Sequence, residues 1–401
     1  MQILVVNSGS SSIKFSVFEV AGGSPSPAIK LDGELRGASD SKTTLRVKRT
    51  GDEKRGRLFD FKIEDTAQAM GVVFDALKSA GMPAMDAVGY RVVHPGPRLK
   101  EHQRITPGVL DELKKAEDFA PLHNPAAVAV ICEGMKRLVD VPHYACFDTV
   151  FHLTMPEEAF SYAIPEDFRE QGVRRYGFHG ISCESIMRSM REEGMALPSR
   201  MVIAHLGSGC SITAVIDGFS IDTTMGLTPT GGVVMGTRPG DLDPGLLLYM
   251  LRHQEGRADA IDNLESILNY RSGMVGLSGL RNDMRQIREA ALGADSRASN
   301  ALKVFTRSVT KAIGSYCWLM GGLDAIVFAG GIGENDGQSR KEILTGLEEL
   351  GVVLDSELNE MKSDDLRRIS ATHSKVAVFI VPSQEDLMIA IHVMQMALSA
   401  S

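Results

Sequence analysis

Residues 201–218 read MVIAHLGSGCSITAVIDG, a glycine- and serine-rich loop between two short apolar runs. Apolar runs of this length, bounded by glycines, predict two buried β-strands joined by a tight turn. Glycine lets the backbone come close to a ligand, and the hydroxyl and N–H groups of such a loop can hold a phosphate. This stretch therefore predicts a phosphate-binding hairpin.

The same arrangement occurs at the N-terminus, where residues 3–17 read ILVVNSGSSSIKFSV. When the two stretches are aligned, Ile13 meets Ile212, about half of the 401-residue chain later. We infer two halves of like design, each beginning with a strand–loop–strand unit, whose loops face a shared cleft. A chance match of two common hairpins is equally compatible with these two stretches alone.

The composition excludes several classes of protein. With 43% hydrophobic and 23% charged residues, the 401-residue chain is typical of a globular protein with two or three domains. A net charge of −8 argues against a nucleic-acid partner. There is no apolar run of the ~18 residues that a membrane span needs, and no basic secretory leader. The five scattered cysteines are typical of reduced thiols, so we expect a cytoplasmic protein.

Strand and helix patterns alternate along the chain, which predicts an α/β fold. Apolar residues recur at helical spacing over 65–79 and 288–320, and buried strands are expected at 87–93, 144–151 and 376–381. The polar stretch between Pro156 and Pro165 marks the junction of the halves. We assign residues 1–150 plus 385–401 to an N-terminal lobe and 151–384 to a C-terminal lobe.

Glycine loops follow predicted strands at 7–12, 207–211 and 330–335. None has the GxxxxGK[ST] pattern of a P-loop, and the first lacks the GxGxxG of a Rossmann fold. A plain turn is the alternative at each loop taken alone. Three such loops in one chain predict a nucleotide site of another type.

Two arginines are the cations best placed to hold an anion. Arg91 lies in the apolar run AVGYRVV, where an unpaired charge is costly, and Arg238 follows the glycines of 231–236. Guanidinium groups bind phosphate and carboxylate through paired hydrogen bonds, and phosphoryl transfer needs fixed cations around the moving group. A structural ion pair is the alternative for each arginine.

Oxygen-bearing side chains stand beside predicted strand ends, and Asn7, Asp148 and Glu385 could together hold Mg²⁺. The two carboxylates could instead serve at helix starts. Single histidines such as His102 are more often structural. Cys210 has no lysine or histidine next to it in the sequence, so we interpret it as a small packing residue and not as a nucleophile.

The sequence resembles the acetate kinase family, within the superfamily of acetate and sugar kinases, Hsp70 and actin. The shared segments occur in the family's order from residue 3 to about 390: VVNSGSSSIKFSVF, GYRVVHPG, APLHNP, FDTVFH, RRYGFHGIS, DTTMGLTP, GTRPGDLDPG, GIGEN and QEDLMIA. The resemblance implies two ribonuclease-H-like (actin-like ATPase) lobes with an interlobe cleft, in agreement with the half-length repeat.

The resemblance also implies an activity. Such an enzyme transfers a phosphoryl group reversibly from ATP to acetate, giving acetyl phosphate and ADP, with Mg²⁺ or alternatively Mn²⁺. It would be a homodimer with no nucleic-acid or membrane partner. The alternatives are a propionate or butyrate kinase, a diphosphate-dependent acetate kinase and, from a different class, an actin-like nucleotide-binding assembly module.

Residue roles follow by matching positions to the family's motifs. Catalytic roles fall to Arg91, Asp148, His179, Arg238 and His123. The resemblance implies that Asn7 and Glu385 bind the metal. It implies that the acyl substrate is bound by Arg91, Val93, Leu122, Phe178 and Pro229. The nucleotide residues are Lys14, His205, Gly207, Ser208, Gly209, Asp283, Arg285, Gly331, Ile332, Gly333, Glu334 and Asn335.

Three positions depart from the family's pattern. Ser208 stands where asparagine is usual, Gly231 where an acidic residue is usual, and Ile391 where arginine is usual. The first departure bears on the phosphoryl donor, and the other two bear on contacts between the lobes.

Overall fold

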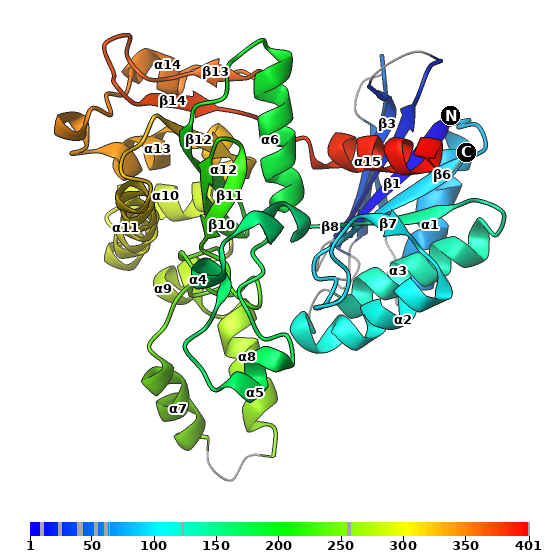
Figure 1. The fold of residues 1–401 in the computed structure, drawn as a ribbon, viewed down its shortest axis with the longest axis horizontal. Coiled ribbons are helices and arrows are strands. Elements are labelled where there is room, and N and C mark those ends of the chain that lie inside the picture. Colours follow the sequence, from blue (N-terminus) through cyan, green and yellow to red (C-terminus); the bar gives the residue numbers. More distant parts are fainter. Residues whose placement is uncertain are drawn as a thin grey trace. The chain divides into compact units, whose positions relative to one another are not determined.

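A computed structural model describes the chain apart from residues 9–11, 23–25, 38–42, 52–54, 60–62, 64, 122–123, 255–257 and 400–401. The chain folds into two compact units (Figure 1). Unit 1 comprises Met1–Val150, Gly180–Ser185 and Gln384–Ser401, and unit 2 comprises Phe151–His179 and Ile186–Ser383. The sequence division had placed Gly180–Ser185 in the C-terminal lobe, whereas this segment packs with unit 1.

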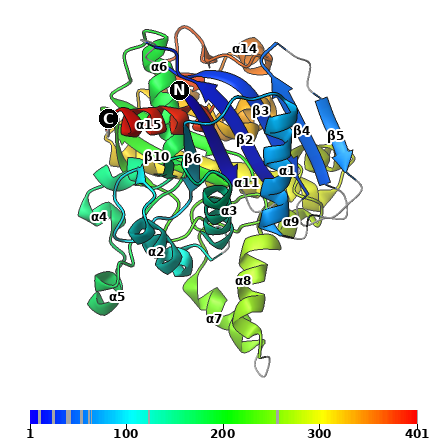
Figure 2. The same cartoon turned by 90° about the vertical axis from the view of Figure 1, so that its right-hand side faces the viewer.

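In unit 1, eight strands of the described chain form one mixed sheet in the order β5-β4-β3-β2-β1-β6-β8-β7. Figure 2 shows β2 to β5 side by side in this sheet. The strands are β1 (Gln2–Ser8), β2 (Ser12–Glu19), β3 (Ala28–Arg36), β4 (Thr43–Arg49), β5 (Arg55–Phe59), β6 (Ala87–Val92), β7 (Gln103–Arg104) and β8 (His143–Phe147).

The order of the strands brings distant residues to one edge of the sheet. β1 and β2 form the predicted antiparallel hairpin, in which Asn7 lies opposite Lys14. β6 runs parallel to β1, and β8 runs parallel to β6. Asn7 near the end of β1, Arg91 near the end of β6 and Asp148 directly after β8 therefore share the edge where ligands bind in parallel α/β sheets.

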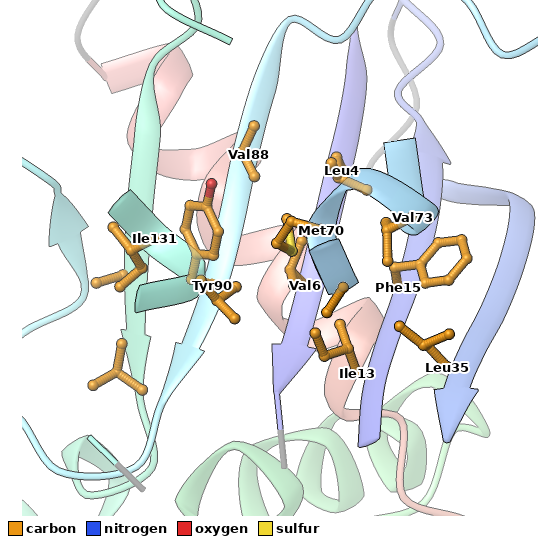
Figure 3. Close-up of a cluster of buried hydrophobic side chains, with 14 of the residues drawn as sticks. Leu4, Val6, Ile13, Phe15, Leu35, Met70, Val73, Val88, Tyr90 and Ile131 are labelled. Atoms are coloured by element: carbon orange, nitrogen blue, oxygen red, sulfur yellow. The ribbon is translucent and has the colours of Figure 1, made fainter. Parts of the chain in front are cut away.

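Side chains alternate between the two faces of β1. Leu4 and Val6 belong to a core that is covered by α1 (Thr66–Ser79) and α3 (Asn124–Arg137), as Figure 3 shows. Ile3 and Val5 pack on the opposite face with α15 (Glu385–Ser399). Gly89 permits this packing, because an added Cβ would lie 2.6 Å from Val393. Unit 1 also contains α2 (Pro107–Lys115) and the first part of α6 (Gly180–Glu192).

In unit 2, six strands of the described chain form a second sheet in the order β11-β10-β9-β12-β14-β13. They are β9 (Arg200–Leu206), β10 (Cys210–Ile216), β11 (Phe219–Thr223), β12 (Ala325–Ala329), β13 (Arg367–Arg368) and β14 (Ala377–Ile380). The run β11-β10-β9-β12-β14 repeats the order and strand directions of β3-β2-β1-β6-β8 in unit 1. The predicted α/β fold with two ribonuclease-H-like halves is therefore confirmed.

The remaining helices of unit 2 are α4 (Glu157–Phe160), α5 (Glu166–Glu170), α7 (Pro244–Arg252), α8 (Ala260–Tyr270), α9 (Gly273–Ser278), α10 (Met284–Leu292), α11 (Ser296–Leu319), α12 (Gly330–Asn335), α13 (Gly337–Leu344) and α14 (Ser356–Glu360). The prediction that 288–320 is mostly helical is confirmed. The end of α10 and the whole of α11 cover that range, and the chain turns between them at Ala294, whose φ is +67°. Within the described chain, every helix is too short or too polar to cross a bilayer.

Candidate functional site

Arg91 is held by Asp148 in unit 1 through paired hydrogen bonds. Its Nε donates to Oδ1 at 3.0 Å and its Nη2 to Oδ2 at 2.5 Å. The Asp148 side chain is only 1% exposed and that of Arg91 is 16% exposed. Burial opposes the charge of Arg91, but Asp148 and Glu385 outweigh it and raise the pKa of the guanidinium, so Arg91 is a permanent cation. The anion that the apolar strand required is an internal carboxylate.

Asn7 connects Arg91 to the start of α15. Its Oδ1 accepts from Arg91 Nη1 at 3.2 Å, and its Nδ2 donates to Asp386 Oδ1 at 3.1 Å and to Glu385 Oε2 at 3.4 Å. Glu385 Oε2 also lies 3.7 Å from Arg91 Nη1. Arg91, Asp148, Asn7, Glu385 and Asp386 together are called the Arg91 cluster below.

Asp386 is a member of the Arg91 cluster that the sequence reasoning missed. Ser16 Oγ on β2 donates to Asp386 Oδ2 at 2.9 Å, and Asn7 donates to the other oxygen. Burial raises the pKa of Asp386, although these hydrogen bonds partly offset it. The sequence signal that could have identified Asp386 is the adjacent acidic pair in QEDLMIA, in which only Glu385 was interpreted as functional.

The Arg91 cluster contains the kind of donors that Mg²⁺ prefers, namely carboxylate and amide oxygens. Both oxygens of Asp148 are engaged by Arg91. Glu385 Oε2 lies 3.7 Å from Arg91 Nη1 and 3.4 Å from Asn7 Nδ2, outside the paired hydrogen bonds that Asp148 makes with Arg91. The carboxylate and amide oxygens of this residue set fit a divalent cation. Lys14 is exposed on β2 opposite Asn7.

In unit 2, the phosphate hairpin predicted at 207–211 joins β9 and β10, and Ser211 lies opposite His205. His179 Nδ1 lies 3.0 Å from Ser211 Oγ, and the rings of His179 and His205 stack with centroids 4.2 Å apart. His179 precedes α6 with a φ of +58°, a left-handed conformation that is strained for any residue other than glycine. Such strain is typical of functional positions.

Arg238 and His179 converge on Gly209. A Cβ added at Gly209 would lie 2.6 Å from Arg238 Nη2 and 3.4 Å from His179 Nε2. Arg238 Nη1 donates to the carbonyl of Pro229 at 2.6 Å, which fixes the guanidinium. Gly209, His179, His205, Ser211 and Arg238 are called the Gly209 cluster below.

Ser208, the departure from the family's asparagine, is bound within unit 2. Its Oγ accepts from Asn282 Nδ2 at 3.0 Å, and its carbonyl accepts from the N–H of Gly236 at 3.2 Å. Asn282 comes immediately before Asp283. Its hydrogen bond to Ser208 therefore places the segment around Asp283 next to the phosphate hairpin. Asp283 accepts from the N–H of Arg285 at the start of α10, and the exposed guanidinium of Arg285 lies 3.0 Å from Asp283.

The glycine segment 330–335 was expected as a loop and instead forms the short helix α12. Glu334 Oε1 accepts from the N–H groups of Gly330 at 2.8 Å and Ser383 at 3.1 Å. Asn335 Nδ2 donates to the carbonyl of Gly331 at 3.0 Å. An added Cβ at Gly330 would lie 3.1 Å from His205 Nε2, so α12 begins beside the Gly209 cluster. The side chains of Glu334 and Asn335 thus stabilise this segment, whose other predicted residues are Gly331, Ile332 and Gly333.

The residues predicted to hold the acyl group are divided between the units. Val93 is buried after β6 in unit 1, whereas Phe178 and Pro229 belong to unit 2. Phe178 is 1% exposed, and its carbonyl lies 3.0 Å from His152 Nε2. Leu122 and His123 lie outside the described residues. The acyl pocket therefore remains a prediction.

The surroundings of Cys210 do not fit a nucleophile. The side chain is buried on β10, and its Sγ donates to the carbonyl of Gly207 at 3.3 Å. Burial raises the pKa of the thiol to about 12, so it is protonated at neutral pH. This agrees with its interpretation as a packing residue.

Residues 2–391 match the family model described as the Acetokinase family. An acetate kinase of Bacillus velezensis is 40% identical over 405 residues, which is 99% of both chains. The crystal structure of Porphyromonas gingivalis acetate kinase matches with a TM-score of 0.85 and 34% identity, covering 99% of each chain. A propionate kinase structure from Francisella tularensis matches with a TM-score of 0.88 and 33% identity, covering 98% of this chain and 99% of that one.

Proposed function

Because the chain belongs to the acetokinase family of carboxylate kinases, we propose that it transfers a phosphoryl group reversibly between ATP and acetate, giving ADP and acetyl phosphate. The observation that carries this proposal is the full-length similarity to acetate kinases in both sequence and fold. An actin-like assembly module is not favoured, since these matches extend over the whole chain and are to kinases.

The proposed reaction needs positioning and charge neutralisation and no strong base, because acetate is already a nucleophile as its carboxylate. We assign acetate to Arg91. The guanidinium is fixed by Asp148 at Nε and Nη2, while its Nη1 makes the longer contacts of 3.2 Å to Asn7 and 3.7 Å to Glu385. An incoming carboxylate would bind at Nη1, because replacing these longer contacts loses less than replacing the hydrogen bonds to Asp148.

We assign the transferring phosphoryl group to Arg238 and His179. Their convergence on Gly209 supports this, since two fixed donors beside a glycine leave the backbone open to a phosphate. The hairpin residues Gly207 and Ser208, with His205 behind them, would hold the nucleotide phosphates. Asp283 and Arg285 would contact the base and ribose, and Lys14 would add positive charge from the first hairpin.

The proposed reaction is tested by trapping acyl phosphate as a hydroxamate. We expect ATP and acetate to give the highest kcat/KM among acetate, propionate and butyrate. A preference for propionate would favour the propionate kinase alternative. Activity with diphosphate but not with ATP would identify diphosphate as the phosphoryl donor. Absence of acyl phosphate from every acid and donor would reject the proposal.

We propose that the reaction requires Mg²⁺, for which Mn²⁺ can substitute. The cation would be held by Glu385 with Asn7 and would neutralise charge on the phosphates of ATP. EDTA is expected to abolish acyl phosphate formation, and excess Mg²⁺ to restore it. Glu385→Gln should raise the Mg²⁺ concentration that gives half-maximal rate. An undiminished rate in metal-free buffer would contradict this assignment.

We propose that the enzyme is a cytoplasmic homodimer. The support is the apolar surface of α7 and α8, neither of which buries a residue, with Leu248 at 53%, Tyr249 at 57% and Ile261 at 75% exposure. Exposed apolar surface of this kind is typical of protein interfaces. Light scattering should give twice the chain mass. Leu248→Glu with Ile261→Glu should give the monomer, whereas Leu292→Glu, at a 90% exposed position on α10, should not. A wild-type mass of one chain would reject the dimer.

A further inference from the structure

Three ionisable side chains from separate segments meet in unit 1 outside the Arg91 cluster. His102 precedes β7, Glu184 lies on α6 and His392 lies on α15. His392 Nε2 lies 2.6 Å from Glu184 Oε2, and His102 Nε2 lies 3.9 Å from the same oxygen. The side chains are only 9%, 19% and 16% exposed for His102, Glu184 and His392, respectively. Nothing in the proposed reaction uses these groups directly.

The ligand atoms of this trio lie within 4.8 Å of one another, which is close enough for a divalent metal. The hydrogen bonding argues against that use. The N–H of Phe147 donates to His102 Nδ1 at 3.0 Å, so Nδ1 is unprotonated and Nε2 carries the proton of the neutral ring. A metal ligand must offer a lone pair, and His102 Nε2 offers a hydrogen. In the trio, the Glu184 carboxylate is hydrogen-bonded to His392, and the N–H of His102 lies 3.9 Å from the same oxygen.

The charge state of Glu184 fits this arrangement. Burial opposes its ionisation, but the hydrogen bond from His392 and the nearby ring of His102 outweigh burial and lower the pKa of Glu184 to about 2. Burial lowers the pKa of His102, which keeps that ring neutral near pH 7. Glu184 is thus a permanent anion near neutral pH, with a direct and short hydrogen bond to α15.

The trio holds α15 together with a second contact at the start of that helix. The N–H of Gln384 donates to Ser185 Oγ at 3.1 Å, and His392 binds Glu184, the residue beside Ser185. The two attachments are at Gln384, just before α15, and at His392 on α15; eight residues of helix rise about 12 Å. Glu385 and Asp386 of the Arg91 cluster lie between them.

The trio also contacts β8, the strand that ends immediately before Asp148. His102 binds the N–H of Phe147, the residue before Asp148, and its ring centroid lies 4.2 Å from that of His392. The trio therefore connects both groups of acids that flank Arg91. Ile391, where the family has arginine, is buried, and the polar contact at this turn of α15 is made by His392.

We propose that His102, Glu184 and His392 are positioning residues that hold Glu385 and Asp386 of α15 in register with Arg91 and Asn7 for phosphoryl transfer. This inference rests on the proposed function. A small displacement of reacting groups costs a large part of the rate. A directional hydrogen bond between Glu184 and His392 fixes the rotation and axial position of α15, which apolar packing alone fixes less well.

The test is the double variant Glu184→Leu with His392→Leu. Replacing both partners leaves no buried charge unpaired, so the protein should fold with a melting temperature close to that of the wild type. We expect kcat to fall about tenfold, which corresponds to about 1.4 kcal/mol. The Mg²⁺ concentration for half-maximal rate should rise severalfold. Hydrogen exchange of residues 384–390 should be faster than in the wild type.

Two matched single variants complete the experiment. His392→Gln keeps a donor near the position of Nε2 and should retain kcat within about twofold. Gln395→Leu, at an exposed position on the same helix, should leave all four measurements unchanged. A double variant with wild-type kcat, Mg²⁺ dependence and hydrogen exchange would overturn the inference. If the wild type makes no acyl phosphate, the proposed function is rejected. Unchanged hydrogen exchange in the double variant would by itself overturn the positioning role of the trio.

Discussion

Arg91→Ala is expected to lower kcat for acyl phosphate formation by about 10³-fold, because the attacking acetate would lose the fixed cation that holds its carboxylate in place. It should also destabilise unit 1, because Asp148 is 1% exposed and would lose its paired hydrogen bonds. Breaking a buried pair from one side costs about 3–5 kcal/mol. Steady-state hydroxamate kinetics and urea unfolding measure the two effects separately.

Two further variants separate catalysis from folding at this position. Arg91→Lys keeps the positive charge near Asp148 but cannot make the paired geometry, so it should fold and still lose about 10²-fold in kcat. Arg91→Met with Asp148→Asn removes both charges and should recover much of the stability without recovering activity. Near-normal turnover in Arg91→Ala or Arg91→Lys would remove Arg91 from its proposed role.

The parts of the fold that could be predicted from sequence are those set by local patterns. The hairpins β1–β2 and β9–β10 follow from glycine turns between short apolar runs, and their repetition predicted two like halves. Apolar spacing predicted that 288–320 is mostly helical, but it did not place the turn between α10 and α11, where Ala294 adopts a left-handed conformation.

The parts of the site that could not be predicted depend on strand register and on contacts between distant segments. Arg91 and Asp148 were both singled out, but their pairing follows from the parallel alignment of β6 with β8, in which Arg91 lies beside Cys146. His102 was interpreted as a structural histidine because a single histidine is more often a hydrogen-bonding residue of the fold than a functional group. Its neighbours Glu184 and His392 are brought to it only by α6 and α15.

Arg238→Ala is expected to lower kcat by about 10³-fold while the protein stays folded. Arg238 Nη1 donates to the carbonyl of Pro229, and losing this hydrogen bond should cost about 1 kcal/mol of stability. We expect KM for ATP to change much less than kcat, since the guanidinium is assigned to the transferring group and not to the nucleotide. Hydroxamate kinetics at varied ATP would give both parameters.

Gly209→Ala provides an independent test of the same geometry. The added methyl would lie 2.6 Å from Arg238 Nη2, too close for any real contact, so the guanidinium must move although its charge is retained. We expect a loss of kcat that approaches that of Arg238→Ala, because a displaced cation stabilises the phosphoryl group poorly. Arg175→Ala is the matched control, because Arg175 binds the carbonyls of Thr223, Thr224 and Met225 and should affect stability more than turnover. Normal turnover in both Arg238→Ala and Gly209→Ala would show that phosphoryl transfer does not depend on this arginine.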